Sequence, residues 1–370
     1  MSNEREPAGA QAPVIEIDAP VDLFGLTRSG LAERLADWID QPYRVEQLFQ
    51  ALYRDRVRDL GSITTLKKSL RERLAERFVI GRLKIGERDR SSDGTAKVLF
   101  ELRDGTTIET VDIPERRRRT ICVSSQAGCA LGCSFCVTGF WGAGRNLTAG
   151  EIVGQVYGLE EERPDNERPL NLVFMGMGEP LQNLDNLELA LEILTDSIPW
   201  KRITVSTAGI VPGIERIAGW PRRPNLAISL HAPDDGRRDQ IMPINRTYPL
   251  QELLACLREY PLERGRKITF EYILIRDLND RPQDAGALVD LLGGLAAKVN
   301  LIPINPDPVL GERMVPPSAD AVARFRDRLR QSGLFATVRN RRGDDVRAAC
   351  GQLRAPGRQP RGFRRSNLSF

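Results

Sequence analysis

Apolar residues recur with a helical period in three stretches near the N-terminus. The segments "SGLAERLADWI" (29–39), "YRVEQLFQALYRDRV" (43–57) and "TTLKKSLRERLAERF" (64–78) place apolar side chains at spacings of three and four residues. Between these positions lie many arginine and lysine residues. The pattern predicts a small helical accessory domain with basic faces over residues 25–78.

The next segment has the alternation of a β-hairpin. In "TAKVLFELRDGTTIETVDIP" (95–114), two runs of strand-forming residues flank Asp104-Gly105, a dipeptide that favours a tight hairpin turn. We therefore predict a β-hairpin extension over residues 79–118. Glu109 lies on the second strand, and a glutamate taken alone at such a position is usually exposed to solvent.

From residue 119 onward, short apolar runs alternate with helical stretches, which is typical of an α/β fold with a parallel sheet. The strands are predicted at 119–125, 170–180, 202–209, 225–232, 267–275 and 298–306. The helices are predicted at 148–162, 186–197, 212–220, 250–260, 281–296 and 318–333. Six units are fewer than the eight of a closed barrel. The sequence therefore predicts a partial (β/α)6 barrel, or a doubly wound sheet, over residues 119–353.

In both architectures, ligands bind at the carboxyl ends of the strands. Five of the predicted strands end in polar or glycine-containing residues: Ser124-Ser125, Gly176 to Glu179, Ser206-Thr207, Ser229 to His231, and Asn305. We expect a ligand site along this edge of the sheet.

Composition and charge limit the class of protein. Of the 370 residues, 41% are hydrophobic and the net charge is +4, and no apolar run approaches the roughly 20 residues that span a bilayer. Residues 1–24 are rich in proline and alanine, lack the features of a secretory signal and are predicted to be a disordered tail. We expect a cytoplasmic protein without a membrane anchor.

Arginine residues are clustered at two places. Residues 116–119 are four consecutive arginines, and residues 354–370, predicted as a basic disordered tail, carry five arginines and no acidic residue. Such clusters indicate nucleic-acid binding, although an arginine-rich solvated surface is an alternative. The chain has one histidine, His231, which excludes Ser-His-Asp and multi-histidine zinc chemistry. A lone histidine is more often a core residue, but its place at a strand end favours a ligand site.

Four of the six cysteines lie close together in sequence. Cys129, Cys133 and Cys136 have the spacing C-x3-C-x2-C, and Cys122 precedes them. Three thiolates on one loop can hold a [4Fe–4S] cluster and leave one iron open for a ligand. The alternative is a structural zinc with Cys122 as the fourth ligand, in a non-catalytic RNA-binding protein. Zinc sites favour paired C-x2–4-C knuckles, so the spacing favours the cluster.

The cysteine motif, with Phe135 before its last cysteine, resembles that of the radical S-adenosylmethionine (SAM) superfamily. Further motifs follow in order: "CVSSQAGCALGCSFC", "GMGEP", "STAG", "SLHA", "LIPINP" and "GDDVRAACGQL". Together they resemble the adenine-C2 RNA methyltransferase family RlmN over roughly residues 28 to 353. The resemblance implies that the fold is the partial barrel.

The resemblance also implies residue roles. Cys129, Cys133 and Cys136 would hold the [4Fe–4S] cluster. Cys350 would receive a methyl group from SAM, and Cys122 would resolve the resulting RNA adduct through a transient disulfide with it. Glu109 would be the proton acceptor. The implied SAM contacts are Gly178, Glu179, Pro180, Ser206, Ser229, Leu230, His231 and Asn305. The sixth cysteine, Cys256, falls on an apolar helical stripe and is interpreted as a core residue.

The substrates that the resemblance implies are adenosine 2503 of 23S rRNA and adenosine 37 of tRNA, methylated at carbon 2 with two SAM molecules per turnover. An external one-electron donor such as flavodoxin would be needed, and nothing in the sequence indicates an obligate oligomer. The accessory domain, the run 116–119 and the basic tail are candidates for RNA backbone contacts. Two alternatives stay open: methylation at carbon 8 of the same rRNA adenosine, and radical SAM chemistry on a protein or small molecule.

Overall fold

The computed structural model describes residues 20–162, 168–312, 314–339 and 341–354. Its N-terminal module contains the helices α1 (Arg28–Arg34), α2 (Pro42–Tyr53) and α3 (Lys68–Arg77). The strand β1 (Val21–Asp22) pairs in parallel with β2 (Phe78–Val79) and so joins the two ends of the module. The apolar residues of α2 that the period predicts, Val45, Leu48, Phe49 and Leu52, are all buried. Residues 20–24, which the sequence placed in a disordered tail, contain this strand and the fully buried Leu23, whereas residues 1–19 lie outside the described chain.

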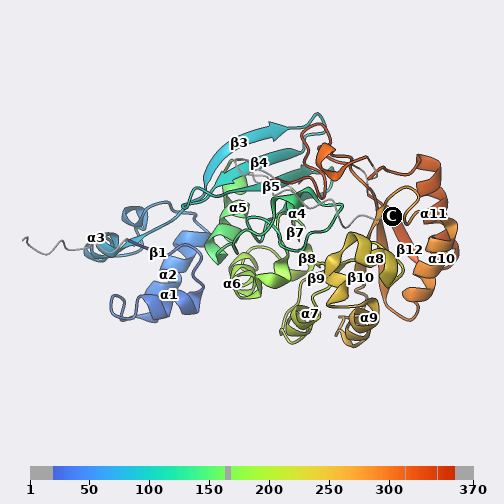
Figure 1. Ribbon diagram of the computed structural model, residues 1–370. Coiled ribbons are helices and arrows are strands. Elements are labelled where there is room, and N and C mark those ends of the chain that lie inside the picture. The colour runs from blue at the N-terminus through green and yellow to red at the C-terminus, as the bar shows by residue number, and fades with distance from the viewer. Residues whose placement is uncertain (1–19, 163–167, 313, 340, 355–370) are drawn as a thin grey trace, which may run out of the picture.

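The rest of the chain is built on one sheet of ten strands (Figure 1), in the order β12-β11-β10-β9-β8-β7-β6-β5-β4-β3. The bounds of its strands are β3 (Lys84–Arg90), β4 (Ala96–Glu101), β5 (Thr107–Pro114), β6 (Arg119–Cys122), β7 (Leu170–Phe174), β8 (Ile203–Thr207), β9 (Asn225–Ser229), β10 (Ile268–Leu274), β11 (Ala297–Pro303) and β12 (Phe335–Val338). The six predicted parallel strands are β6 to β11. They pair in parallel in sequence order, which confirms the partial barrel.

Two features extend this sheet beyond the prediction. A seventh parallel strand, β12, pairs with β11. The predicted hairpin is β4 and β5, a third antiparallel strand β3 pairs with β4, and β5 pairs with β6. The hairpin is therefore a continuation of the barrel sheet, and it brings the face that carries Glu109 beside the strand that ends at Cys122.

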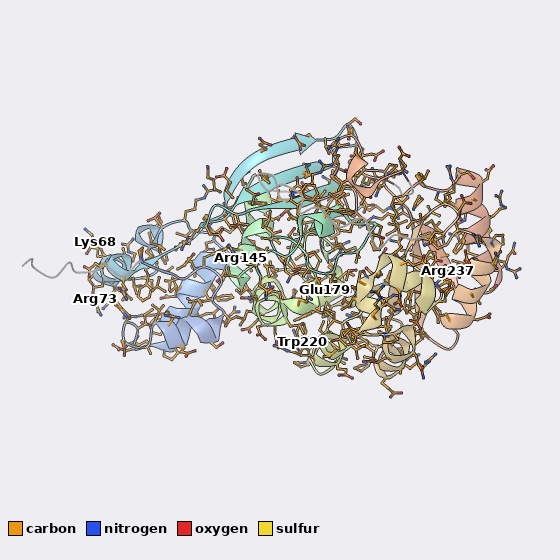
Figure 2. All side chains as sticks on the ribbon, viewed as in Figure 1. Lys68, Arg73, Arg145, Glu179, Trp220 and Arg237 are labelled. Carbon is orange, nitrogen blue, oxygen red and sulfur yellow. The ribbon has the colours of Figure 1, made fainter. Side chains whose placement is uncertain are left out.

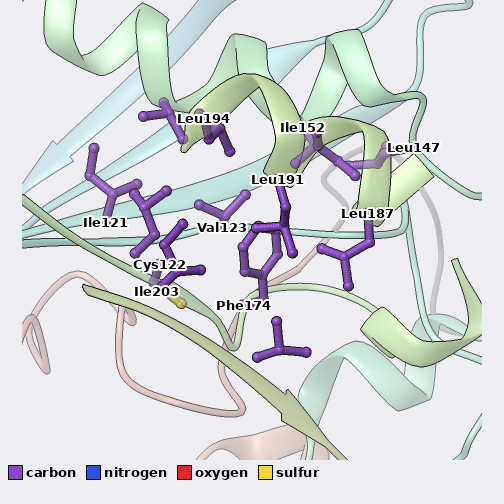
Figure 3. Packing of buried hydrophobic residues seen from close by; sticks show 14 of the residues in the cluster. Ile121, Cys122, Val123, Leu147, Ile152, Phe174, Leu187, Leu191, Leu194 and Ile203 are labelled. Carbon is purple, nitrogen blue, oxygen red and sulfur yellow. The ribbon is translucent and has the colours of Figure 1, made fainter. Parts of the chain in front are cut away.

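Helices cover the outer face of the sheet. Their bounds are α4 (Val137–Trp141), α5 (Ala149–Glu162), α6 (Leu184–Leu194), α7 (Val211–Ala218), α8 (Asp235–Ile241), α9 (Leu250–Glu259), α10 (Pro282–Leu291) and α11 (Ala319–Gln331). Figure 3 shows Leu187 and Leu191 of α6 packing near Phe174 of β7. Because side chains alternate along a strand, Ile121 and Cys122 point to opposite faces of β6. The outer face of the sheet packs against the helices and forms the hydrophobic core with them. The inner face remains available for functional side chains.

Among the described residues, no helix is long and apolar enough to cross a membrane.

Candidate active site

The three-cysteine motif occupies the loop between β6 and α4. The loop folds onto its own continuation, because the Cys129 N–H donates to the Gly142 carbonyl at 3.0 Å and Cys136 is the N-cap of α4. A side chain at Gly144 would lie 1.8 Å from the Ala127 carbonyl oxygen. The close backbone approach that forms the loop therefore requires glycine at position 144.

The electrostatics of the three thiols suit a positively charged ligand. Burial raises the pKa of Cys129 to about 12 and raises the pKa values of Cys133 and Cys136 as well. The Cys136 thiol also raises the pKa values of Cys129 and Cys133, and the Cys136 N–H donates to the Cys133 carbonyl at 3.2 Å. Such thiols ionise when a metal centre compensates their charge. Among the described residues, no three potential ligands converge on a single ion. A four-iron cluster does not require such convergence, because each thiolate binds a different iron.

A second group of predicted residues follows the carboxyl ends of β7 and β8. Glu179 is 3% exposed and accepts hydrogen bonds from the Leu181 N–H at 3.0 Å and the Ala208 N–H at 2.7 Å. Burial raises its pKa to about 7. Gly178 has a φ of +96°, and a side chain there would lie 2.5 Å from Cβ of Gln126. Pro180 begins a short 3-10 helix, Pro180–Gln182, and Ser206 is buried on β8.

The residues after β9 and β11 lie next to the cysteine loop. Ser229 ends β9, and Leu230 and His231 follow it, both buried. His231 Nδ1 accepts a hydrogen bond from the Ile273 N–H at 3.0 Å, and its ring packs edge-on against Phe135 with centroids 4.6 Å apart. Burial lowers the pKa of His231 to about 3, so the ring is neutral. The loop aromatic of the cysteine motif thus contacts the strand-end histidine.

Asn305 joins this edge to the C-terminal segment. Its Nδ2 donates to the Cys350 carbonyl at 3.2 Å, while its Oδ1 is buried without a hydrogen-bond partner in the described part of the chain. A buried acceptor without a donor is costly. The unpaired oxygen, the thiol loop and the buried Glu179 together fit a site that binds a polar cofactor with donor groups beside a metal cluster.

The structure brings Cys122 and Cys350 together from distant parts of the chain. Both are free thiols. Burial, and to a smaller extent the neighbouring Cys350, raise the pKa of Cys122 to about 12. Residues after β12 fold back over the antiparallel extension and the cysteine loop. The Gly351 carbonyl accepts from the Val137 N–H at 2.6 Å, so the preceding residue, Cys350, lies next to the end of the three-cysteine loop.

Glu109 of β5 is covered by the same C-terminal segment that carries Cys350. It is 3% exposed, its Oε2 accepts a hydrogen bond from the Arg354 N–H at 2.7 Å, and its Oε1 is 3.1 Å from Nζ of Lys97. The usual exposure of such a glutamate does not apply here, because the C-terminal segment covers this face of the extension. Burial raises the pKa of Glu109, and the charge of Lys97 opposes the rise.

Several residues support the site through contacts that the sequence did not predict. Ser124 Oγ donates to the Glu109 carbonyl at 2.6 Å and accepts from the Met177 N–H at 2.9 Å. The buried Arg238 donates to the carbonyls of Ala208, Ser229 and Leu230, and so ties the ends of β8 and β9 together. Arg339, directly after β12, carries a positive charge that lowers the pKa of Cys122. Buried arginines and serines have no periodic sequence signal, so only the packed structure reveals these roles.

The two predicted arginine clusters have different outcomes: one residue of the run 116–119 is buried, and most of the basic tail lies outside the described residues. Arg116 to Arg118 are exposed, but Arg119 is 2% exposed and ion-paired with Asp112 and Glu160. Arg119 begins β6 and points toward α5 on the outer, helix-covered face of the sheet, so the predicted RNA contact is wrong for this residue of the run. Residues 355–370 of the basic tail are not among the described ones. Cys256 lies on α9, packs against the core and stays outside the site, as the helical stripe predicts.

The fold and the cysteine loop define a radical SAM enzyme. The model of the Radical SAM superfamily matches residues 123–289. A crystal structure of a radical SAM methyltransferase from Sphaerobacter thermophilus has a TM-score of 0.84 and 46% identity, covering 90% of this chain and 99% of that chain. Enzymes of this superfamily use a [4Fe–4S] cluster and SAM.

The particular family follows from the whole length of the chain. Residues 21–80 match the model of the ribosomal RNA large subunit methyltransferase N-terminal domain. A dual-specificity RNA methyltransferase RlmN of Anaeromyxobacter dehalogenans is 46% identical over an alignment of 354 residues that covers 93% of this chain and 94% of that protein. One from Rhodospirillum rubrum is 47% identical over 349 residues, covering 91% and 81%. The chain belongs to the RlmN family, whose members use two SAM molecules. The alternative of a non-catalytic zinc protein is therefore wrong.

Proposed function

We propose that this protein is a dual-specificity RNA methyltransferase that methylates carbon 2 of adenosine 2503 in 23S rRNA and of adenosine 37 in tRNA. The observation that carries the proposal is that the C-terminal segment around Cys350 contacts the three-cysteine loop through Gly351 and contacts Glu109 through Arg354, beside the strand that ends at Cys122. These residues come from the extension, the first barrel strand and the C-terminal segment. A nucleophile, a second thiol and a buried carboxylate at one cofactor site fit methyl transfer through a protein-bound intermediate.

We expect the cofactors to be held by residues at this edge of the sheet. Cys129, Cys133 and Cys136 would bind the cluster. Glu179 and Asn305 offer buried oxygens to the donor groups of SAM. The other predicted SAM contacts are Gly178, Pro180, Ser206, Ser229, Leu230 and His231. When bound, the cluster supplies the electron that cleaves SAM and so generates a radical able to remove a hydrogen atom from a methyl group.

The chain's own residues would carry the methyl group. Carbon 2 of adenine lies between two ring nitrogens and is electron-poor, so it cannot attack SAM directly. Cys350 would take the methyl by nucleophilic displacement and, after that methyl loses a hydrogen atom, would join carbon 2 of the adenine through a thioether. The adduct would give back the one electron that is used to cleave SAM. Glu109 would accept the carbon 2 proton. The Cys122 thiolate would then attack the sulfur of Cys350, as in thiol–disulfide exchange. The S–S bond would form, the bond from sulfur to the methylene carbon would break, and that carbon would take a proton to become the methyl group of the released RNA.

The surface that would bind RNA is supported by exposed basic residues. Lys67, Lys68 and Arg73 are exposed on or beside α3, and Figure 2 shows Lys68 and Arg73 at the outer end of the N-terminal module. Arg116 and Arg117 are exposed next to β6. Contacts of these residues to the RNA backbone would position the adenosine, which must leave its stack to reach the thiols.

The experiment that tests this proposal compares three cysteine variants. We expect Cys122→Ala to accumulate a covalent protein–RNA adduct, because the methylated Cys350 can still react but cannot be released. Cys350→Ala should form neither adduct nor product. Cys256→Ala, a matched control on α9, should behave as the wild type. An adduct in both of the first two variants, or in neither, contradicts the mechanism.

Mass spectrometry of the released nucleoside determines which carbon is modified. A methyl group at carbon 2 supports the proposal, and one at carbon 8 replaces it with the sister activity. SAM cleavage without modification of RNA would instead indicate a protein or small-molecule substrate.

A further inference from the structure

A row of charged side chains crosses the antiparallel extension next to Glu109. Asp89 of β3 pairs with Lys97 of β4, Lys97 pairs with Val111 of β5, and Val111 pairs with Cys122 of β6. Glu109 is two residues from Val111 on the same strand. Because side chains alternate along a strand, Asp89, Lys97 and Glu109 share the face that carries Cys122.

The three side chains are in direct contact. Nζ of Lys97 is 3.1 Å from Oε1 of Glu109 and 3.3 Å from Oδ2 of Asp89. The exposed fraction of the side chain rises along this series, from 5% for Glu109 to 12% for Lys97 and 50% for Asp89. A continuous polar path therefore leads from the buried carboxylate to solvent.

Two positively charged residues lie near Glu109, and they differ in how strongly other carboxylates neutralise them. Glu109 faces Lys97 from β4 and Arg354 from the C-terminal segment, which donates its backbone N–H. The Arg354 guanidinium is itself paired with the buried Asp307, with Nη2 and Oδ2 2.5 Å apart. Lys97 is shared with Asp89, which is half exposed and therefore solvated. Lys97 is thus the cation that best compensates a negative charge on Glu109.

A base that must accept a proton has to be ionised first, and a buried carboxylate resists ionisation. We propose that Lys97 is a positioning residue that keeps Glu109 ionised and, together with Asp89, conducts the abstracted proton to solvent. This inference rests on the proposed role of Glu109 as the proton acceptor.

The transfer balances without any other reactant. Glu109 Oε1 takes the proton from the substrate carbon and becomes a neutral acid. That proton moves to Lys97 Nζ as another proton leaves Nζ for Oδ2 of Asp89 and then for water. One proton reaches solvent, each side chain regains its starting charge, and no electron leaves the path.

The test measures the pH dependence of single-turnover product formation, with the cluster-loaded full-length enzyme carrying methylated Cys350 and an RNA fragment containing the target adenosine. Activity requires the carboxylate, so it is present above the pKa of Glu109 and lost below it. Lys97→Met removes the influence that lowers this pKa. We expect the acidic limb of the Lys97→Met profile to lie about one pH unit or more above that of the wild type. At pH values below both limbs, the variant should then be about tenfold slower than the wild type.

Two variants serve as controls. Lys97→Arg keeps the charge and should keep the profile. Lys84→Met removes a lysine of the neighbouring strand β3 that pairs with Glu101 at the surface, and should leave the rate unchanged. Asp89→Asn should lower the plateau rate without moving the acidic limb upward, because it interrupts the path and leaves Lys97 in place.

Cleavage of SAM to 5′-deoxyadenosine does not involve Glu109, so each variant should keep the wild-type rate of this step. A variant that keeps it but loses product formation is impaired after SAM cleavage. If Glu109→Gln turns over at the wild-type rate, the proposed role of Glu109 fails. If Glu109→Gln is inactive but Lys97→Met has a wild-type profile, only the inference about Lys97 is overturned. If Lys97→Met does not fold, Lys97→Arg and Asp89→Asn remain: an upward shift in Lys97→Arg, or an unchanged plateau in Asp89→Asn, overturns the inference.

Discussion

The arginine run 116–119 contains exposed residues that are candidates for RNA binding and one buried residue, Arg119, that we expect to stabilise the fold. Variants of the two kinds test this difference. Arg119 is 2% exposed, with Nε 2.8 Å and Nη2 3.2 Å from the two carboxylate oxygens of Asp112. It also pairs with Glu160 and donates to the Leu159 carbonyl. Its guanidinium joins β5, β6 and α5 at the junction of the barrel and the extension.

The perturbation is Arg119→Met, which replaces the aliphatic part of the side chain with an unbranched apolar chain and removes the guanidinium charge. Asp112 is 3% exposed, so the variant leaves a buried carboxylate without its partner. Breaking a buried ion pair from one side costs about 3–5 kcal/mol. We therefore expect the free energy of unfolding to fall by about that amount, measured by urea denaturation. Arg117→Met, an exposed neighbour, should change the free energy of unfolding by no more than about 0.5 kcal/mol.

The opposite pattern is expected for RNA binding. Arg117→Met should weaken binding and reduce its salt dependence if it neutralises a phosphate, whereas Arg119→Met should leave the salt dependence unchanged in the folded fraction. The double variant Arg119→Met/Asp112→Asn should recover part of the stability, because it removes the uncompensated charge. A stable Arg119→Met protein with a reduced salt dependence would refute the buried assignment.

Two further predictions concern the cofactor site. Gly144→Ala should lower the iron content of the reconstituted protein, because a side chain 1.8 Å from the Ala127 carbonyl oxygen displaces the cysteine loop. Gly286→Ala is the control and should keep its iron, because nothing lies within 4 Å of the added side chain. Equal iron content in the two variants would contradict the packing argument. Arg238→Lys should weaken SAM binding in isothermal titration by about tenfold or more, because lysine cannot reach the three carbonyls that tie β8 to β9. Arg216→Lys, an exposed arginine paired with Asp185 and Glu188, is the matched control, and equal affinities would show that the strand ends are held in another way.

The sequence by itself determined the six central strands, most of the helices and the edge of the sheet that carries the site. These features depend on local periodicity and on residues that follow the strands directly, and parallel strands bring such residues to one edge whatever the rest of the chain does. The cysteine loop was also local, since its spacing lies within eight residues, 129–136. Two strands gave no such signal. In β3 nearly every residue is exposed, so it lacks an apolar alternation, and β12 has four residues.

Tertiary structure alone decided which polar residues are buried. Glu109, Arg119 and Arg238 carry the same charges as many exposed residues, and their environment depends on segments far away in sequence. The return of residues 341–354 over the extension buries Glu109 and places Cys350 beside Cys122. Desolvation then raises the pKa of Glu109, and Lys97 compensates it across a strand pairing. Periodicity predicts which face of an element is apolar, but burial of a charge depends on what packs against it, and that is fixed only when the chain is folded.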